Sequence, residues 1–496
     1  MFEMRKLFLL SVIATLMFSL QEAYGQVEKA LTFDEVIKLS EEQSPNALIA
    51  KHTFRSSYWE YRTFVAQYRP SLTLSGNLPS YSKGSDRQWD KDQNSYYYSY
   101  TDIMQNIGNL SLSQNIGFTG GTISLNSGLN FENNYIRETK TFKSSPVAIQ
   151  LVQPLFKYNS LKWEKKTEPV KYEAAKRTFL YNIETVHQRA VANFFALALA
   201  QINVQIAEMN FSNSDTLYRM AAGRYKLGTI AEDELLQMEL TWLNAQNSMK
   251  EAEMNLRDKE IRLRSFLGFN ENVRLVLILP NEIPTLQIDV QKALTLAHAN
   301  NPTILNQQLT ILTAQSKLAE AKASRGLNAD LTFTYGLDDS GSSLSTVYDD
   351  PLNSQGITIG VKLPILDWGL GKGKYKMAQS SLELAKVQSE QTLVDFDQNL
   401  TLDVEQFNLQ GEQVAIAAKS DTVAMKMYDV TKARFLIGKI DVLELSNADT
   451  KKDENRRAYI QALQNYWSYF YNVRSLSLYD FVNDKPLETD YSKLLQ

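Results

Sequence analysis

The chain has 496 residues, of which 44% are hydrophobic and 22% charged, and its formal net charge is −4. This charge gives no sign of a nucleic-acid partner or an acidic substrate, and a mean hydropathy of −0.32 excludes a membrane protein built of many spanning helices. The absence of cysteine excludes disulfides, thiol nucleophiles, cysteine metal sites and lipid attachment through an N-terminal cysteine. The three histidines, His52, His187 and His298, are far apart and show no ligand spacing.

Residues 1–25 have the pattern of a secretory signal peptide. Arg5 and Lys6 precede an apolar run from Leu7 to Leu20, and small residues follow at Ala23 and Gly25. The run is too short for a transmembrane helix, which needs about 20 apolar residues. We therefore expect cleavage after Gly25 and export of the mature chain. The remaining sequence offers no stretch apolar enough for a spanning helix, so any membrane crossing is expected to use β-strands.

Two short motifs recur at a fixed distance along the chain. Residues 223–228 (GRYKLG) reappear as residues 433–438 (ARFLIG), a shift of 210 positions. The same shift places residues 153–156 (QPLF) on residues 363–366 (LPIL). Internal self-similarity of this kind indicates a duplicated architecture.

The duplication defines the expected domain organisation. We assign residues 26–284 to a first repeat, 285–485 to a second repeat and 486–496 to a C-terminal tail. Pro45 corresponds to Pro302 at a larger shift of 257, so the first repeat holds about 47 more residues between these landmarks. Each repeat is expected to contain a helix, strands, and a long helical hairpin.

The first repeat is expected to open with a helix. This helix begins near Thr32, where Glu35 three residues on fits a capping box, and it passes Pro45 to reach about Tyr68. Residues 171–222 contain neither Gly nor Pro and have apolar residues at spacings of three and four, which predicts a helix of about 75 Å.

Further stretches free of Gly and Pro extend the helical pattern; they are 229–267, 375–410, 412–437 and 439–485. Their apolar stripes are wide and rich in Ala, Leu, Gln and Asn. Such a stripe suits helices with two neighbours, as in a wall of helices. A plain coiled-coil rod is the alternative.

Strands are expected within residues 71–153 and 329–363. Apolar residues alternate there with uncharged polar residues, which is typical of outer-membrane strands and also of a half-buried soluble sheet. The signal peptide and the adjoining long helices favour the membrane. The hairpin at 109–132 has no counterpart in the second repeat. One chain thus offers four matching strands, or six with this hairpin, whereas membrane barrels begin at about eight. Several chains must therefore share one barrel.

This arrangement resembles the TolC family of outer-membrane efflux proteins over nearly all of the mature chain. The resemblance rests on the duplicated halves, on the strand-to-helix passages at 153–156 and 363–369, and most specifically on the paired motifs at 224–228 and 434–438. It implies an α+β membrane protein: a homotrimer in which four strands per chain form a twelve-stranded β-barrel. A long α-helical barrel would continue it into the periplasm. The hairpin at 109–132 departs from this pattern and leaves the strand set open.

The same resemblance implies a function and partners. The protein would be a passive outer-membrane exit duct of a tripartite efflux or type I secretion system. It would work with a periplasmic adaptor protein and an inner-membrane pump, in contact with outer-membrane lipid. No cofactor and no enzymatic activity are expected.

The tips of the two helical hairpins are candidate functional sites. Glycine at each tip is explained structurally, because a helix end commonly needs a positive φ. In the resembled family the tips are also docking points for the adaptor. The corresponding residues in this chain are Arg224, Gly228, Thr229, Arg434, Gly438 and Lys439.

Asp441 and Glu444 are candidate gate residues. They lie three apart and so share one helix face, and they match in type and spacing the acidic residues that ring the periplasmic entrance in the resembled family. Repeated around a trimer, these carboxylates would bind cations and help to hold the entrance shut. The alternative is a solvated first helix turn, where acidic residues favour the helix dipole. The first repeat has Ala231 and Glu234 at the equivalent positions, so the ring would be uneven.

Two other functions remain as alternatives. A periplasmic coiled-coil scaffold without channel activity predicts a water-soluble mature protein. An enzyme is the weaker alternative, because acid pairs such as Asp338–Asp339 lie in a Ser- and Gly-rich segment typical of solvated turns. The basic run at 369–374 lacks the full spacing of a phosphate-binding loop, and we interpret it as a flexible junction.

Overall fold

The computed structural model describes most of the chain. The described residues are 28–269, 273–280, 282–437, 439–440 and 442–495. The signal peptide predicted at residues 1–25 lies outside this part of the chain.

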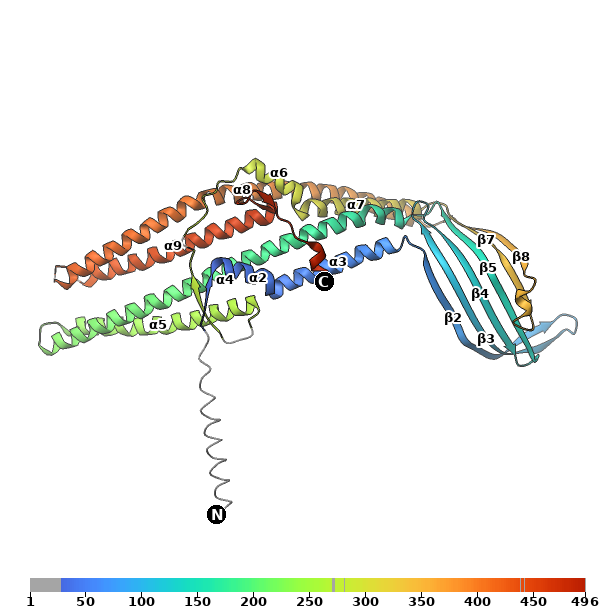
Figure 1. The fold of residues 1–496 in the computed structure, drawn as a ribbon, viewed down its shortest axis with the longest axis horizontal. Helices are drawn as coiled ribbons and strands as arrows, with labels where there is room; N and C mark the ends of the chain where they lie inside the picture. Colours follow the sequence, from blue (N-terminus) through green and yellow to red (C-terminus); the bar gives the residue numbers. More distant parts are fainter. Residues whose placement is uncertain (1–27, 270–272, 281, 438, 441, 496) are drawn as a thin grey trace, which may run out of the picture. The chain divides into compact units, whose positions relative to one another are not determined.

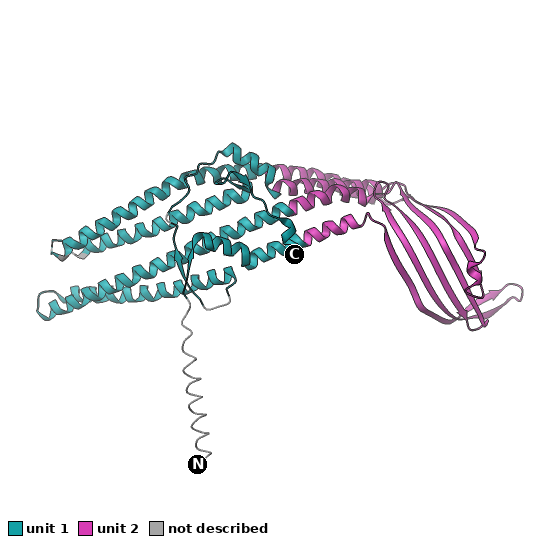
Figure 2. Ribbon diagram, in the orientation of Figure 1, with its two compact units in different colours: residues 1–55, 176–302, 394–496 teal, residues 56–175, 303–393 magenta. Residues whose placement is uncertain are grey.

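The chain divides into two compact units (Figure 2). Unit 1 contains the residues up to Arg55 together with 176–302 and those from 394 onward. Unit 2 contains 56–175 and 303–393. Each unit draws segments from both halves of the sequence, so this division cuts across the predicted repeats.

The first helix begins where the sequence predicts. In α2 (Phe33–Gln43), the backbone N–H of Thr32 donates to Glu35 Oε2 over 2.8 Å, and the N–H of Glu35 donates to Thr32 Oγ1 over 3.3 Å. These reciprocal bonds form the expected capping box.

The chain then breaks before a separate helix, α3 (Pro45–Ala66). The expectation of one helix from Thr32 to about Tyr68 is therefore wrong. A proline at position 45 disfavours helical geometry in the residue before it, and Ser44 is extended. The Ser44 hydroxyl then caps α3 by accepting a hydrogen bond from the N–H of Ala47 over 3.1 Å.

Two long helical hairpins have the same proportions (Figure 1). In each, a helix of 67 residues is followed by one of 36 residues. Their bounds are α4 Ser160–Lys226, α5 Glu232–Leu267, α8 Leu370–Leu436 and α9 Val442–Ser477. The shorter helices also match, since α2 and α6 (Val290–Asn300) have 11 residues each, and α3 and α7 (Pro302–Ser324) have 22 and 23. A helix of 67 residues is about 100 Å long.

The run expected to form a flexible junction at 369–374 is helical from Leu370 onward, as the start of α8. The carboxylate of Asp367 accepts hydrogen bonds from the N–H of Gly369 over 2.9 Å and from that of Gly371 over 2.8 Å. These bonds satisfy amide groups at the helix start, and the helix continues through Gly411.

The core of unit 1 joins helices from both halves. Phe194 of α4, Phe407 of α8 and Tyr466 of α9 are fully buried in one hydrophobic cluster. A parallel strand pair, β1 (Glu28–Thr32) with β6 (Arg274–Ile278), contributes to the same cluster. The sequence analysis did not anticipate this pairing.

Contrary to the expectation from the sequence, one helix of the described chain, α4, is long and apolar enough to cross a membrane by length and composition. Half of its most apolar window is buried inside the structure. Because Phe194 and Leu197 are both fully buried in the core, packing explains the high hydropathy of this helix.

The predicted C-terminal tail packs within unit 1. The short helix α10 (Tyr491–Leu494) places the Tyr491 ring 5.2 Å from that of Phe54. The Nε of Arg55 donates to the carbonyl oxygen of Leu494 over 2.5 Å. Just before it, β9 (Tyr479–Asp480) and β10 (Lys485–Pro486) form a small antiparallel pair.

Unit 2 contains one curved antiparallel sheet of six strands, in the order β2-β3-β4-β5-β7-β8 (Figure 1). The strands are β2 Ser71–Asp90, β3 Ser95–Ile116, β4 Gly121–Asn134, β5 Thr139–Leu155, β7 Asn328–Gly341 and β8 Leu352–Lys362. A turn of 3-10 helix (Thr346–Tyr348) lies between β7 and β8.

The hairpin whose place the sequence left open is central to this sheet. Residues 109–132 fall in β3 and β4, which pair with each other and with strands on both sides. Among the described residues, six strands pair in this sheet, whereas the resemblance implies four per chain. Alternation alone did not reveal this because it gives the faces of a strand and not its neighbours. The number of strands in an assembled barrel stays a prediction.

Candidate functional site: the helical hairpin tips

The first tip lies between α4 and α5. Gly228 has a φ of 69°, in the left-handed region that favours glycine. The N–H of Thr229 donates to the carbonyl oxygen of Arg224 over 3.0 Å, and its hydroxyl donates to the same oxygen over 2.9 Å. These bonds satisfy carbonyl groups that the helix end would leave unpaired.

The second tip, between α8 and α9, repeats this closure. The N–H of Lys439 donates to the carbonyl oxygen of Arg434 over 3.0 Å, which is the equivalent bond 210 positions further on. Gly438 and Asp441 lie outside the described residues. The repeated motif thus encodes the same helix-ending turn twice.

An ion pair crosses the second tip. Nη1 of Arg434 lies 3.9 Å from Oε1 of Glu444, and both side chains are more than half exposed. Sequence reasoning assigned these residues to separate roles and missed the pair. The two residues are ten positions apart on either side of a predicted hairpin turn, and this spacing could have indicated that they lie close together.

Acidic residues gather in the first turns of the helices that leave the tips. In α5 they are Glu232, Asp233 and Glu234, and in α9 Glu444. Negative charge at a helix N-terminus is favourable because it faces the positive end of the helix dipole. The first tip therefore carries more acidic groups than the sequence comparison of Ala231 and Glu234 suggested.

The described tip residues form an open surface. Arg224, Gly228 and Thr229 are exposed, as are Arg434 and Lys439. Large apolar side chains are exposed beside them, namely Leu227, Ile437 and Leu443. Exposed apolar groups among charged ones are typical of a surface that binds another protein. In the described part of the chain, no group of three or more His, Cys, Asp or Glu is placed to hold a metal ion.

Behind the tips, buried polar contacts join α9 to two other helices. Lys452 Nζ lies 2.5 Å from Asp449, 3.3 Å from Asp453 and 4.1 Å from the centre of the Tyr428 ring on α8. Burial lowers the pKa of Lys452, but the two carboxylates outweigh this effect and the net pKa is raised. Asn210 on α4 donates to Asp453 over 3.2 Å. These contacts link the two hairpins, and nothing in the sequence pattern predicted them.

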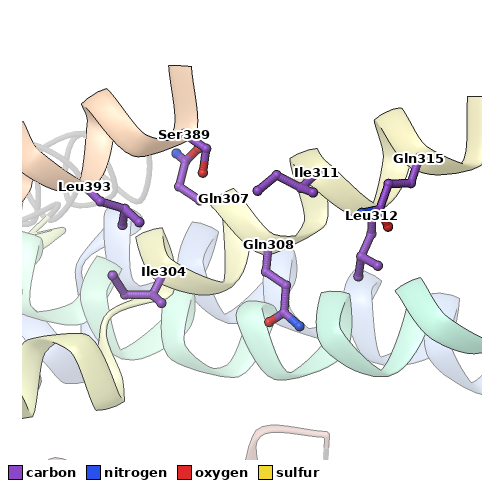
Figure 3. Close-up of a pocket in the computed structure, with 8 residues that line it drawn as sticks. All are labelled: Ile304, Gln307, Gln308, Ile311, Leu312, Gln315, Ser389 and Leu393. Carbon is purple, nitrogen blue, oxygen red and sulfur yellow. The ribbon is translucent and has the colours of Figure 1, made fainter. Parts of the chain in front are cut away.

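Unit 2 has an open groove between α7 and α8, with a volume of about 290 Å³ (Figure 3). Its lining consists of Ile304, Gln307, Gln308, Ile311, Leu312, Gln315, Ser389 and Leu393. None of these residues is charged, so the groove offers nothing to neutralise a charged ligand. Its mixture of aliphatic and amide side chains is suited to packing against another helix.

A protein-family model described as outer membrane efflux protein matches residues 36–269 and 293–476. A search of curated protein sequences found no match.

Solved structures share the fold. The CmeC outer membrane channel of Campylobacter jejuni aligns with a TM-score of 0.66 and 14% identity, covering 93% of this chain and 88% of that one. A membrane protein from Pseudomonas aeruginosa gives 0.62 and 12%, with 90% of each chain covered. VceC of Vibrio cholerae gives 0.60 and 13%, with coverages of 92% and 97%. At these identities the likeness establishes an α+β fold of the outer-membrane channel type.

Proposed function

The chain belongs to the outer membrane efflux protein family, and from this premise we propose that it is the passive exit duct of a tripartite efflux or type I secretion system. Members of the family are transport proteins of the outer membrane that extend into the periplasm, and this chain is an outer-membrane efflux duct of that kind. The observation that carries the proposal is the family match across both halves, together with the repeated tip closure.

The proposed working form is a homotrimer with a shared barrel and a helical tunnel. The six-stranded sheet supports a shared barrel, because it has fewer strands than the eight or so needed to close one alone. The uncharged groove between α7 and α8 is suited to helix packing between copies.

The proposed division into repeats, 26–284 and 285–485 with a tail at 486–496, is supported by the matched helix lengths. Each pair of equivalent helices differs by at most one residue. Duplication of one ancestral helix–strand–helix unit accounts for this match. The additional residues of the first repeat accommodate the hairpin of β3 and β4.

Adaptor docking is proposed at the two tips. The residues assigned to it are Arg224, Gly228, Thr229, Arg434, Gly438 and Lys439. The exposed Leu227 and Ile437 support this assignment, because they give a partner protein apolar surface to cover. An inner-membrane pump supplies the energy for transport in this scheme.

The gate is proposed at Asp441 and Glu444. In one chain Arg434 partly neutralises Glu444, so the charge of the entrance depends on this arginine as well. Opening would separate the tips, and the contacts of Lys452 and Asn210 behind them would resist that movement.

The test is single-channel conductance of the detergent-purified mature protein in planar bilayers. Discrete channels are expected, and Asp441→Ala with Glu444→Ala is expected to raise the open fraction or alter ion selectivity. Glu253→Ala is the matched control, because Glu253 is an exposed carboxylate on α5 paired with Lys250 over 2.9 Å. A water-soluble mature protein without conductance would contradict the duct and support the scaffold. Channels that respond equally to both changes would contradict the gate alone.

A further inference from the structure

The sheet of unit 2 ends in two open edges. Among the described residues, β2 pairs only with β3, and β8 pairs only with β7. Each outer edge therefore carries a row of backbone N–H and C=O groups without strand partners. Such edges cannot face lipid, because the hydrocarbon region offers no water to satisfy them.

An apolar belt crosses the sheet on one face. Leu72, Leu112, Leu125, Ile149 and Tyr335 lie directly opposite one another on successive strands from β2 to β7. Residues opposite each other across paired strands point to the same face. The central hairpin supplies two members of this row, so it carries the same lipid-type surface as its neighbours.

A second row extends the belt to the other edge. Ile123, Leu151, Phe333 and Ile357 are directly opposite one another from β4 to β8. Ile123 shares a face with Leu125, two positions along the same strand. All six strands therefore contribute to one continuous apolar face.

The opposite face is polar along the same stretch. Ser113, Ser124, Gln150, Thr334 and Gly356 form the row between the two apolar ones. A sheet that is apolar on one face and polar on the other matches the wall of a membrane barrel, with lipid outside and water inside.

Exposure within the belt identifies where neighbours are missing. Leu74 lies two positions after Leu72 on β2 and so shares the apolar face. Leu74 is 78% exposed and Ile357 on β8 is 69% exposed, whereas Leu125 and Ile149 on inner strands are 44% and 41% exposed. A strand flanked on both sides shields its side chains, so the excess at both edges indicates that each lacks one adjoining strand.

The two edges are complementary in direction. Every neighbouring pair from β2 to β8 is antiparallel, so five successive reversals make β2 and β8 run in opposite directions. A second copy of the chain can therefore continue the antiparallel pattern across the seam.

We propose that β8 of one copy pairs antiparallel with β2 of the next, and that all six strands of each chain take part in the barrel. This inference rests on the proposed homotrimer. The trimer then has an eighteen-stranded barrel instead of a twelve-stranded one. Barrel diameter grows with strand number, and barrels of 16–18 strands leave an aqueous channel. The outer-membrane section of this duct is thus wide enough to hold an aqueous channel.

The place of the central hairpin can be tested by lipid contact, because the native chain has no cysteine. A bimane dye is attached to Leu112→Cys or Leu125→Cys, and the protein is reconstituted in vesicles of brominated phosphatidylcholine. Strong quenching is expected at both positions. The neighbouring variants Ser111→Cys and Asn126→Cys face the polar side and should be quenched little. Equal, weak quenching at all four positions would place the hairpin outside the barrel wall and overturn the proposal.

The seam can be tested by cross-linking. Thr73→Cys on β2 is combined in turn with single cysteines from Ser354 to Val361 on β8. Covalent dimers and trimers are expected on non-reducing gels for a few adjacent positions of this scan, since disulfides need close Cα atoms. The control combines Asn126→Cys, on the inner strand β4, with the same scan and should give none.

The outcomes separate this inference from the duct itself. A trimer by mass that cross-links through Asn126→Cys but never through Thr73→Cys would place the seam at β4, which contradicts six strands per chain and leaves the duct intact. A monomer in detergent, without cross-links in either scan, would contradict both the inference and the proposed trimer.

Discussion

The helical core of unit 1 buries its large apolar side chains, whereas the sheet of unit 2 leaves large apolar side chains exposed. Phe194 and Phe407 are fully buried among helices from both halves of the chain. Leu74 and Ile357 lie on strands and remain mostly exposed. Both regions are rich in large apolar residues, so composition does not distinguish them.

The difference lies in what covers the apolar surface. In unit 1 the chain buries its own core. The apolar belt of unit 2 is not covered by the chain itself, and in the proposed assembly lipid and another copy of the chain cover it. The stability of the first region should therefore be a property of one chain, and that of the second a property of its surroundings.

The largest expected effect is a cavity in the core of unit 1. Phe194→Ala should destabilise unit 1 by about 3–5 kcal/mol, because it removes a fully buried ring. Leu74→Ala should cost less than Phe194→Ala, since Leu74 lies on the belt at the edge of the sheet and not in the packed core of one chain. Thermal unfolding followed by circular dichroism in detergent compares the two. Equal losses of stability in the two variants would contradict the claim that only unit 1 depends on a core buried within one chain.

A charge on the belt should have the next largest effect. Ile149→Arg is expected to cost about 2–4 kcal/mol of folding free energy in a bilayer. Gln150→Arg, on the opposite face of the same strand, is the control and should be tolerated. Refolding into lipid vesicles, followed by the mobility difference between folded and unfolded protein on gels, measures both. Greater damage from Gln150→Arg would mean that the faces are assigned the wrong way round.

A charge cluster around the buried side chains of His187 and Glu184 is expected to make the stability of unit 1 depend on pH. His187 lies 3.3 Å from Glu184 and 3.5 Å from Glu41, and Arg474 lies 3.0 Å from Glu184 and 3.7 Å from Asp480. Burial opposes protonation of His187, but the two nearby glutamates outweigh it, and its pKa is raised above 6.5. The interaction with His187 lowers the pKa of Glu41 below 4.5.

The direction of the pH effect follows from these shifts. A raised histidine pKa gives stability that is complete below about pH 6.5 and is lost as the pH rises through the folded pKa. The depressed Glu41 pKa gives stability that is lost as the pH falls through its own folded pKa. His187→Gln should abolish the decline in melting temperature on the alkaline side. An unchanged decline in this variant would assign the pH dependence to other groups.

The smallest expected effect concerns the second tip. Arg434→Ala breaks an exposed ion pair of 3.9 Å, so its cost in stability should be at most about 1 kcal/mol. It also removes the positive charge beside Glu444 and makes the proposed entrance more negative, which should increase cation selectivity. Reversal potentials in a salt gradient measure this, with Arg262→Ala on α5 as a control that also breaks an arginine–carboxylate pair. Equal cation selectivity in the two variants would contradict the proposal that Arg434 contributes to the charge of the entrance.

Local chemistry explains what the sequence could predict. The capping box of Thr32 and Glu35 and the left-handed Gly228 each depend on residues within a few positions, so their motifs were sufficient. The strand faces followed from alternation of apolar and polar residues. The outer-membrane duct was predicted through the family resemblance, and the family match confirms it.

The features that the sequence could not predict depend on pairing between residues far apart in the chain. β1 pairs with β6 across most of the first half of the chain, and no local pattern records that partnership. Alternation in β3 and β4 showed their faces but not that they lie inside the sheet. At the tips, the approach of Arg434 to Glu444 depends on the turn between them, and Lys452 is buried by helices distant in sequence. The break at Ser44 was predictable, because Pro45 was its signal.

The most direct test of the central claim is a cryo-electron microscopy reconstruction of the detergent-purified assembly in which the barrel strands are counted. The account predicts three chains that share a closed barrel of eighteen strands, with β8 of each copy beside β2 of the next. A barrel of twelve strands, or a sheet whose edges close within a single chain, would contradict it.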